Sequence, residues 1–211
     1  MDYNIRLIKN DSYTPTYWSG GMAAELITYP ESSSFAGRDF LWRMGCAKID
    51  IDTSTFSLLP GIKRHLMVTE GQMTLAHKDR HTKLLTKFDQ DFFMGDWSTT
   101  TEGRCSVLNL MTRENYEGML VHIHLSKDKK TDFTCSHMEN SSIAALCIYP
   151  LNSSINMNCD SRLIQINKND LLCIDNILSS KLLPKLQFSV HDSESADIII
   201  GVIYKNNQVP V

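Results

Sequence analysis

The chain has 211 residues, of which 42% are hydrophobic and 21% are charged, and its formal net charge at pH 7 is −3. This length suits one large all-β domain or two smaller ones, and it is ample for a hydrophobic core. Acidic and basic residues are interspersed, so the sequence predicts no nucleic-acid or other polyanionic partner.

The first twelve residues, MDYNIRLIKNDS, carry charges where a secretory leader would have an apolar region. The longest apolar runs, such as 198–203, are far shorter than the roughly 20 residues that span a bilayer. We therefore expect a cytoplasmic protein with no membrane partner. The six cysteines are scattered without a C-x-x-C pair, and we expect them to be buried thiols rather than disulfides.

Alternating apolar and polar residues predict short strands throughout the first half of the chain. These strands are predicted at 1–10, 23–29, 40–51, 64–69, 73–77, 82–88 and 104–112. In the strand 40–51, Arg43 and Gly45 share a face with Leu41, Ala47 and Ile49. The stretch 88–97 mixes acids and aromatics with a glycine and is predicted to be a loop that closes over a cavity.

Phe56 to Gln72 is the stretch around which the first half is organised. Pro60-Gly61 is a turn signal, and the acidic-glycine pair Glu70-Gly71 predicts a β-hairpin that joins 64–69 to 73–77. Arg64 and His65 follow the first turn, so either one of them projects into the mouth of a β-barrel or the two form a solvated basic pair.

The charged stretch 113–116 is predicted to join the two halves, and short strands continue beyond it. They are predicted at 118–125, 132–137, 142–150, 161–167, 170–174, 186–191 and 197–204. Many short strands at a spacing of roughly 8–12 residues indicate an all-β sandwich or barrel.

Six short motifs occur in order in the first half. They are WSGG at 18–21, FLWR at 40–43, FSLLPGIKR at 56–64, EG at 70–71, FxGDW at 93–97 and NLMTR at 109–113. In this order and at these spacings the sequence resembles the HutD/Ves family, which is associated with histidine utilisation in some bacteria and with stress responses in others. The resemblance covers about residues 8–115.

This resemblance implies an all-β RmlC-like cupin fold, built as a double-stranded β-helix and arranged as a bicupin-like pair of barrels. We expect residues 1–115 to form the first cupin barrel, which carries the motifs, and residues 116–211 to form a divergent second barrel half, packed with the first as one compact unit. Family habit also implies a homodimer, whereas the biochemical activity of the family is not settled.

The chain departs from the family pattern at two places. Val107-Leu108 replaces a usual Asp-Phe pair, and Ala23-Ala24 stands where threonine is frequent. Both changes remove polar groups. Either the site is altered in this chain, or these positions do not contact a ligand.

A set of polar and aromatic residues in the first half supplies candidate ligand-binding side chains. These are Trp18, Glu25, Arg43, Arg64, Asp96, Asn109 and Arg113. Inward arginines bind carboxylates through paired, charge-assisted hydrogen bonds, so a small carboxylated metabolite is the expected partner. The family resemblance implies a compound of the histidine pathway, such as urocanate or a formylated or amidated glutamate. The alternative is a buried Arg–Glu network that holds the barrel shut.

His65 and Glu70 are the candidates for metal-free acid–base catalysis. Five residues across a strand and a turn separate them, so periodicity alone does not place them on one face. The chain has no G-x-S-x-G motif, so nucleophilic catalysis has little support.

A metal-dependent cupin typically carries two histidines two residues apart, followed by a carboxylate at fixed glycine spacing. The first half has nothing like it. His122 and His124, followed by Asp128, are the metal-ligand candidates of the second half, because two-residue spacing on a strand places both imidazoles on one face. The glycine spacing does not match, so we expect no metal cofactor.

Together, these features favour a metal-free cupin that binds a small carboxylated metabolite, as a sensor or an accessory factor of a catabolic pathway. The first alternative is an enzyme, either an isomerase or hydrolase that uses His65, or a metal-dependent oxygenase that uses His122 and His124. The second alternative is an interaction protein that acts through its dimer surface.

Overall fold

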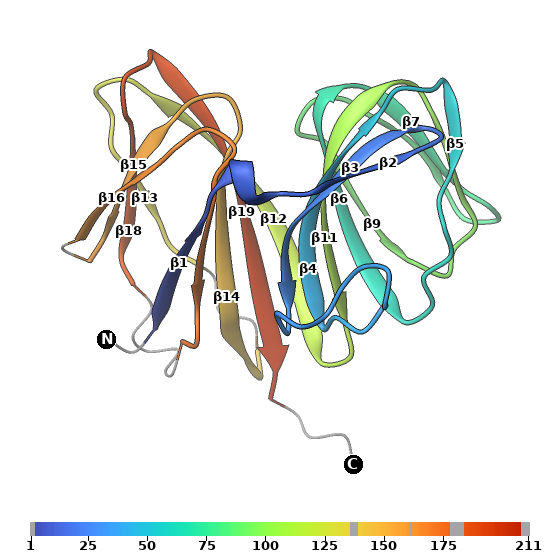
Figure 1. Cartoon of the computed structure of the whole chain (residues 1–211), viewed down its shortest axis with the longest axis horizontal. Coiled ribbons are helices and arrows are strands. Elements are labelled where there is room, and N and C mark those ends of the chain that lie inside the picture. The colour runs from blue at the N-terminus through green and yellow to red at the C-terminus, as the bar shows by residue number, and fades with distance from the viewer. Residues whose placement is uncertain (1–2, 136–138, 161, 178–183, 208–211) are drawn as a thin grey trace. The chain divides into compact units, whose positions relative to one another are not determined.

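The computed structural model describes residues 3–135, 139–160, 162–177 and 184–207. Within these residues the chain is built from strands and one short 3-10 helix, η1 (Asn10–Ser12) (Figure 1). This confirms the predicted all-β class. The strands group into two units, one of Tyr13–Gly118 and one of Met1–Ser12 together with Met119–Val211.

The unit Tyr13–Gly118 contains a six-stranded sheet in the order β2-β3-β4-β11-β6-β9 and a four-stranded sheet in the order β5-β10-β7-β8. The strands are β2 (Pro15–Trp18), β3 (Gly21–Tyr29), β4 (Trp42–Ile49), β5 (Thr53–Thr55), β6 (Ile62–Gly71), β7 (Met73–His77), β8 (Thr82–Leu85), β9 (Gln90–Met94), β10 (Thr99–Glu102) and β11 (Cys105–Arg113). In strands such as β7, alternation buries one face, and the inward faces of the two sheets pack into one core that includes Leu66 and Val68 from β6 and Met73 and Leu75 from β7.

β11 lies between β4 and β6 and sets their register. Met111 is opposite both Arg43 and Arg64, and Asn109 is opposite both Gly45 and Leu66. Residues that are directly opposite one another project to the same side of a sheet. Because Leu66 is fully buried in the core, the two arginines and Asn109 also project inward. The prediction that Arg43 and Gly45 share a face is confirmed.

The predicted hairpin at Glu70-Gly71 is wrong. β6 pairs with β11 and β9, whereas β7 pairs with β10 and β8 in the other sheet. Gly71 has a φ of 75°, and a Cβ there would lie 2.6 Å from the carbonyl oxygen of Arg104, so the chain crosses between sheets at a glycine. Glycine with a positive φ occurs both in hairpin turns and where a chain passes from one sheet to another. Only the pairing partners of the two flanking strands distinguish the two cases.

The predicted loop at 88–97 also contains a strand. β9 covers Gln90–Met94 and pairs with β6, so that Phe93 lies opposite Arg64. Phe93 therefore lies inside the unit, whereas Phe92 next to it is exposed.

The other unit contains a five-stranded sheet in the order β1-β17-β14-β19-β12 and a four-stranded sheet in the order β13-β18-β15-β16. The strands are β1 (Asn4–Ile8), β12 (Tyr116–Ser126), β13 (Thr131–Phe133), β14 (Ser141–Pro150), β15 (Ile155–Cys159), β16 (Arg162–Ile166), β17 (Leu171–Asp175), β18 (Leu186–Val190) and β19 (Ser195–Asn206). Aliphatic residues of both sheets, with Phe188, form its core.

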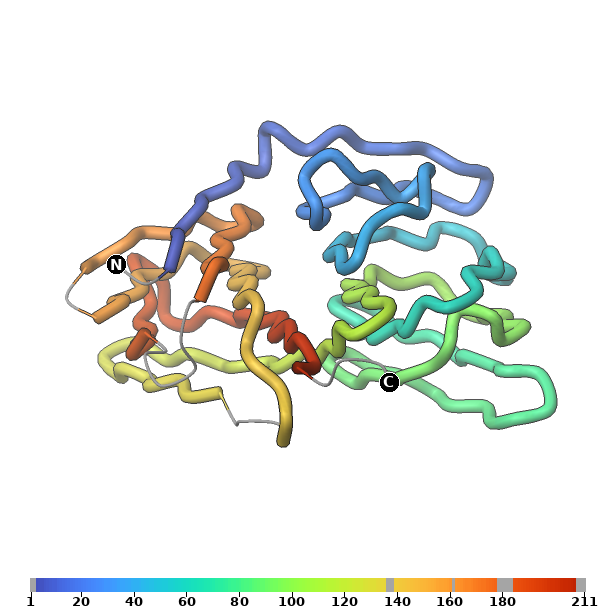
Figure 2. The backbone as a smooth tube through the Cα atoms, turned by 90° about the horizontal axis from the view of Figure 1, so that it is seen from below, coloured from blue at the N-terminus to red at the C-terminus, as the bar shows by residue number. Residues whose placement is uncertain are grey.

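β1 is the strand that departs from the predicted division of the chain. It was expected in the first barrel, but it pairs antiparallel with β17, and Figure 2 shows this N-terminal segment beside the strand from the second half. The Arg6 Nη2 lies 2.6 Å from the Asp175 Oδ2 across the pair. The alternation in NIRLI predicts a strand, but it contains no information about a partner 163 or more residues later in the chain.

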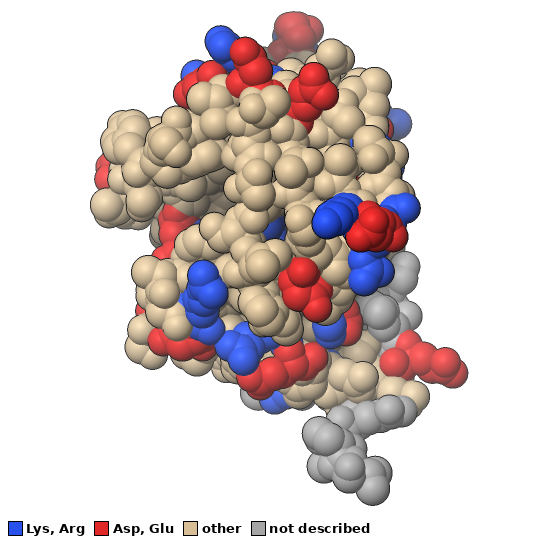
Figure 3. Space-filling view, turned by 90° about the vertical axis from the view of Figure 1, so that its right-hand side faces the viewer, with Lys and Arg blue, Asp and Glu red and all other residues tan. Residues whose placement is uncertain are grey.

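On the face drawn in Figure 3, basic and acidic side chains are interspersed, in keeping with the net charge of −3. All six cysteines are free thiols, and all but Cys46 and Cys135 are buried. No helix in the described part of the chain is both long enough and apolar enough to cross a membrane.

Candidate functional site

Two arginines project into the interior of the unit Tyr13–Gly118. Arg43 from β4 and Arg64 from β6 flank Met111 of the intervening strand, and their exposed fractions are 7% and 6%. A Cβ at Gly45 would lie 2.5 Å from the Arg43 Nη2. Glycine at this inward position therefore leaves the space that the guanidinium occupies.

Arg43 has one acidic partner. The Glu25 Oε2 lies 3.3 Å from the Arg43 Nε, and the Phe35 ring lies with its centroid 4.6 Å from the guanidinium carbon. Burial lowers the pKa of Arg43, and the charge of Glu25 opposes this effect. The same Glu25 oxygen accepts a hydrogen bond from the Phe35 backbone N–H at 3.0 Å, so Glu25 also holds the loop that covers Arg43.

Arg64 is buried between two aromatic rings and beside a neutral amide. Its guanidinium carbon lies 4.6 Å from the Phe56 ring centroid and 4.9 Å from that of Phe93, and its Nη2 donates to the Asn109 Oδ1 at 3.2 Å. Its Nε has no hydrogen-bond partner. Among the described residues no carboxylate forms an ion pair with it. Burial, followed by the charge of Arg43, lowers the pKa of Arg64 to about 9.

The remaining predicted ligand residues lie away from the guanidinium pair. Arg113 donates to the Arg38 carbonyl oxygen at 2.9 Å and so ties down the loop 30–39. Asp96 is exposed in the turn after β9. Trp18 pairs with Gly21, which is opposite Ile49, six residues from Arg43 along β4 and so roughly 20 Å away. The structure therefore brings together Glu25, Arg43, Arg64 and Asn109, but neither Trp18 nor Asp96.

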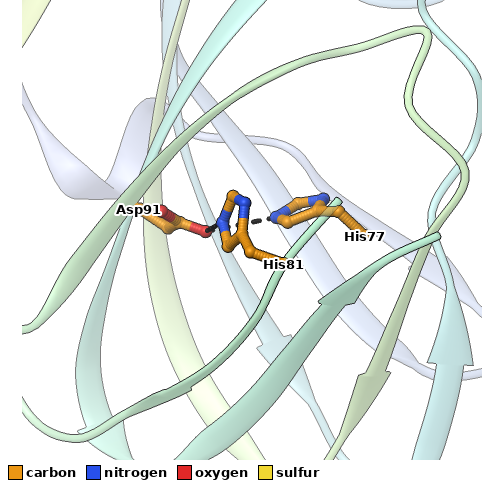
Figure 4. A group of neighbouring side chains, drawn as sticks. All are labelled: His77, His81 and Asp91. Carbon is orange, nitrogen blue, oxygen red and sulfur yellow. Dashed lines mark hydrogen bonds and ion pairs between the residues drawn. The ribbon is translucent and has the colours of Figure 1, made fainter. Parts of the chain in front are cut away.

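A second group of chemically capable side chains was missed from the sequence. His77, His81 and Asp91 each offer a ligand atom, and the three atoms lie within 4.8 Å of one another (Figure 4). The spacing His-x3-His across the turn between β7 and β8 is the local signal. The carboxylate comes from β9 in the other sheet, so pairing it with the histidines required the tertiary structure.

Comparison with known proteins decides the family. The HutD family profile matches residues 10–191, which is most of the chain. The chain belongs to the HutD family. None of the curated proteins compared with it matches its sequence.

Solved structures similar to this HutD-family chain share its fold. A conserved protein of unknown function from Pseudomonas aeruginosa PAO1 has a TM-score of 0.78 at 17% identity, covering 95% of this chain and 98% of that chain. HutD from Pseudomonas fluorescens SBW25 has a TM-score of 0.69 at 18% identity, covering 94% and 98%. Oxalate decarboxylase from Lactobacillus farciminis, in a formate complex, has a TM-score of 0.64 at 7% identity, covering 96% and 86%. These likenesses confirm the predicted cupin-like fold.

The structure shows where Val107, one of the two residues that depart from the HutD/Ves pattern, lies. Val107 lies in the core of the unit, on the same inward face of β11 as Asn109. The resemblance implies an acidic residue at this position, and in this HutD-family chain an inward valine stands there instead.

The candidate acid–base pair is separated in the structure. A β-bulge between Ser106 and Val107 shifts the register of β6, so that His65 lies opposite Leu110 and Glu70 opposite Ser106. Four residues of β11 separate these positions, which is roughly 13 Å. His65 contacts the Phe92 ring, and burial lowers the pKa of His65 to about 4. The structure does not bring His65 and Glu70 together.

The candidate metal ligands of the second half meet a different acid from the one expected. The His122 Nε2 and the His124 Nδ1 each lie 2.9 Å from the Asp197 Oδ1 on β19. Asp128 lies in an exposed turn with a φ of 62°. Asn152 donates to the other oxygen of Asp197 at 2.9 Å, and its own side-chain oxygen accepts from the Asp197 backbone N–H. This network joins β12 to β19 through hydrogen bonds.

Proposed function

We propose that this HutD-family chain binds a small carboxylate between Arg43 and Arg64, with Asn109 beside it, as a sensor or accessory protein of a catabolic pathway. The observation that carries the proposal is the state of Arg64. It is a buried cation whose nearest polar partner is a neutral amide and whose Nε has no hydrogen-bond partner.

The charges of the site favour an anionic ligand. A buried charge without a partner costs several kcal/mol, and among the described residues Glu25 pairs with Arg43 while no carboxylate pairs with Arg64. A ligand carboxylate would supply the missing negative charge and accept paired N–H donors from a planar guanidinium. Guanidinium nitrogens have no free lone pair, so these inward side chains suit an anion and cannot serve as metal ligands.

The class of ligand rests on chemistry and on family likeness. The enclosed position of both arginines favours a small acid, and the HutD/Ves resemblance suggests an intermediate of histidine breakdown, such as urocanate or formylglutamate. Formate, the smallest carboxylate, occurs in the oxalate decarboxylase structure of similar fold. Formate is therefore a suitable minimal probe.

Calorimetric titration in the presence of a chelator tests the proposal. Wild-type protein is titrated with formate, urocanate, formylglutamate and, as an uncharged control, formamide. Arg64→Met is compared with Arg104→Met, because Arg104 is exposed and forms a surface ion pair with Asp52. We expect saturable, metal-independent binding of at least one acid, lost in Arg64→Met and retained in Arg104→Met.

A thermal-shift measurement provides a second readout. A ligand at about one hundred times its dissociation constant stabilises the folded state by about 2.7 kcal/mol. At roughly 2–4 °C per kcal/mol for a chain of this size, the melting temperature should rise by several degrees. Absence of binding by every acid, or equal binding by wild type and Arg64→Met, would show that the arginines are structural.

A further inference from the structure

His77, His81 and Asp91 meet where the two sheets of the unit Tyr13–Gly118 approach one another (Figure 4). His77 is the last residue of β7, His81 lies between β7 and β8, and Asp91 is on β9. The Nε2 atoms of His77 and His81 lie 3.1 and 2.9 Å from the same atom, the Asp91 Oδ2. Both imidazoles therefore direct the same ring nitrogen at one carboxylate oxygen.

Thr99 is the hydrogen-bond partner of the inner nitrogen of His77. The Thr99 hydroxyl donates to the Trp97 carbonyl oxygen at 3.1 Å, and its Oγ1 lies 2.8 Å from the His77 Nδ1. When the Nδ1 carries the ring proton, it donates to this hydroxyl oxygen, and the Nε2 turns a lone pair toward the Asp91 Oδ2 3.1 Å away. This tautomer suits a cation between the Nε2 and the carboxylate. When the Nε2 carries the proton instead, it donates to the Asp91 Oδ2 directly.

The cluster is closed off from water on the His77 side. The exposed fractions of the His77 and Asp91 side chains are 0% and 10%. A neutral imidazole and an ionised carboxylate are the forms in which both residues bind metal ions.

We propose that the His77 Nε2, the His81 Nε2 and the Asp91 Oδ2 are the ligands of a divalent transition-metal ion. Metal-ligating histidines usually donate their second ring N–H to an oxygen acceptor, and the Thr99 Oγ1 is placed to accept that of His77. Around a tetrahedral ion, ligand atoms about 2.1 Å from the metal lie about 3.4 Å apart. The two nitrogen-to-oxygen distances are 3.1 and 2.9 Å, and all three ligand atoms lie within 4.8 Å of one another, so small side-chain shifts would admit the ion.

The ligand set indicates the class of metal. Two imidazole nitrogens and one carboxylate oxygen suit zinc or ferrous iron, whereas calcium and magnesium prefer sites made of oxygen ligands. Three protein ligands leave coordination positions open for water or a small molecule. The site lies apart from the His122–His124 pair, and none of its residues was expected to bind metal from the sequence.

The surroundings position the ligands and give the ion a route from solvent. The Lys83 Nζ lies 3.8 Å from the Asp91 Oδ1 and holds the carboxylate oxygen that faces away from the histidines. Trp97 contacts both imidazoles edge-on, with ring centroids 5.3 and 6.0 Å away. The His81 side chain is 42% exposed, whereas that of His77 is fully buried, so the ion would enter from the His81 side.

The test is metal titration of chelator-treated, full-length protein. Zn²⁺ binding is measured by calorimetry, and Co²⁺ binding by its visible absorption, which reports nitrogen and oxygen coordination without any catalytic assay. The main variant is His81→Gln, because this partly exposed residue can be changed with little risk to the fold. We expect it to bind Zn²⁺ at least 100-fold more weakly than wild type.

Two further variants sharpen the result. Thr99→Val removes the acceptor of the His77 Nδ1 proton, and we expect a 10- to 100-fold loss of Zn²⁺ affinity, as for other residues that position a ligand. His122→Gln alters the other histidine pair and should bind Zn²⁺ as wild type does. Thermal unfolding of each variant establishes that it is folded.

The proposal is overturned if wild-type protein does not bind Zn²⁺ or Co²⁺, or if His81→Gln and Asp91→Asn bind them as tightly as wild type. Loss of binding in His122→Gln instead would place the metal in the other unit. Carboxylate binding should survive in His81→Gln, and Zn²⁺ binding should survive in Arg64→Met. The metal site and the carboxylate site can therefore fail independently.

Discussion

Replacing Arg64 by methionine should stabilise the protein while abolishing its binding of carboxylates. The fall of the Arg64 pKa from 12.5 to about 9 corresponds to about 5 kcal/mol of unfavourable free energy for the charged form. The variant loses the contacts with Phe56 and Phe93, which stabilise by about 1–2 kcal/mol. It also leaves the Asn109 amide oxygen without its donor, at about 1–2 kcal/mol. The net expectation is a gain of about 1–3 kcal/mol.

Urea denaturation followed by tryptophan fluorescence measures this gain. Trp18, Trp42 and Trp97 all lie in the unit that contains Arg64, so the signal reports on that unit. At roughly 2–4 °C per kcal/mol, the melting temperature should also rise. Arg104→Met, at an exposed position, should change stability by no more than about 0.5 kcal/mol.

The opposite result would refute the reasoning. If Arg64→Met lowers the free energy of unfolding by more than about 1 kcal/mol, the guanidinium is a net stabiliser held between two aromatic rings, and no missing anion needs to be invoked. If the variant is more stable but still binds formate as wild type does, the unfavourable charge is real and the ligand binds elsewhere.

Three further predictions concern the same unit. Glu25→Gln removes the ion-pair partner of Arg43, so urea unfolding should show a loss of about 1–2 kcal/mol in the free energy of unfolding. Calorimetry should show tighter carboxylate binding, and weaker binding would mean that Glu25 itself contacts the ligand. Gly45→Ala places a Cβ 2.5 Å from the Arg43 Nη2, and carboxylate affinity should fall at least tenfold; unchanged affinity would exclude Arg43 from the site. His65 is neutral in the folded state down to its pKa of about 4. Its contribution to the free energy of unfolding, about 3 kcal/mol, is therefore present above about pH 6.5 and is lost as the pH falls towards 4. Urea midpoints at pH 7, 5 and 4 should therefore fall less steeply in His65→Gln than in wild type, and parallel slopes would contradict the assignment.

The order of strands along the chain could be predicted to a large extent, because alternation is a local property of a strand with one buried face. The face shared by Arg43 and Gly45 followed directly from this period of two. Short strands without clear alternation, such as β5 and β10, were not predicted. The strand β9 was also missed, because its glycine and acidic residues resemble those of a loop.

The candidate site was predicted in part. Glu25, Arg43, Arg64 and Asn109 were identified from the sequence and do converge, since β3, β4, β11 and β6 are successive neighbours in one sheet. Trp18 does not join them, because β2 pairs with the opposite end of β3 from the one that approaches Arg43. The order of the motifs in the sequence does not show how far apart two residues lie along the strands of the barrel.

What the sequence determined by itself was the all-β class, the family and the face shared by Arg43 and Gly45, because each depends on local alternation or on residues close together in the chain. Only the tertiary structure decided which strands are partners. It separated β6 from β7, placed β1 beside β17, and brought Asp91 to His77 and His81 from the other sheet. Strand pairing depends on contacts between residues far apart in sequence, and alternation is the same whichever partner a strand has.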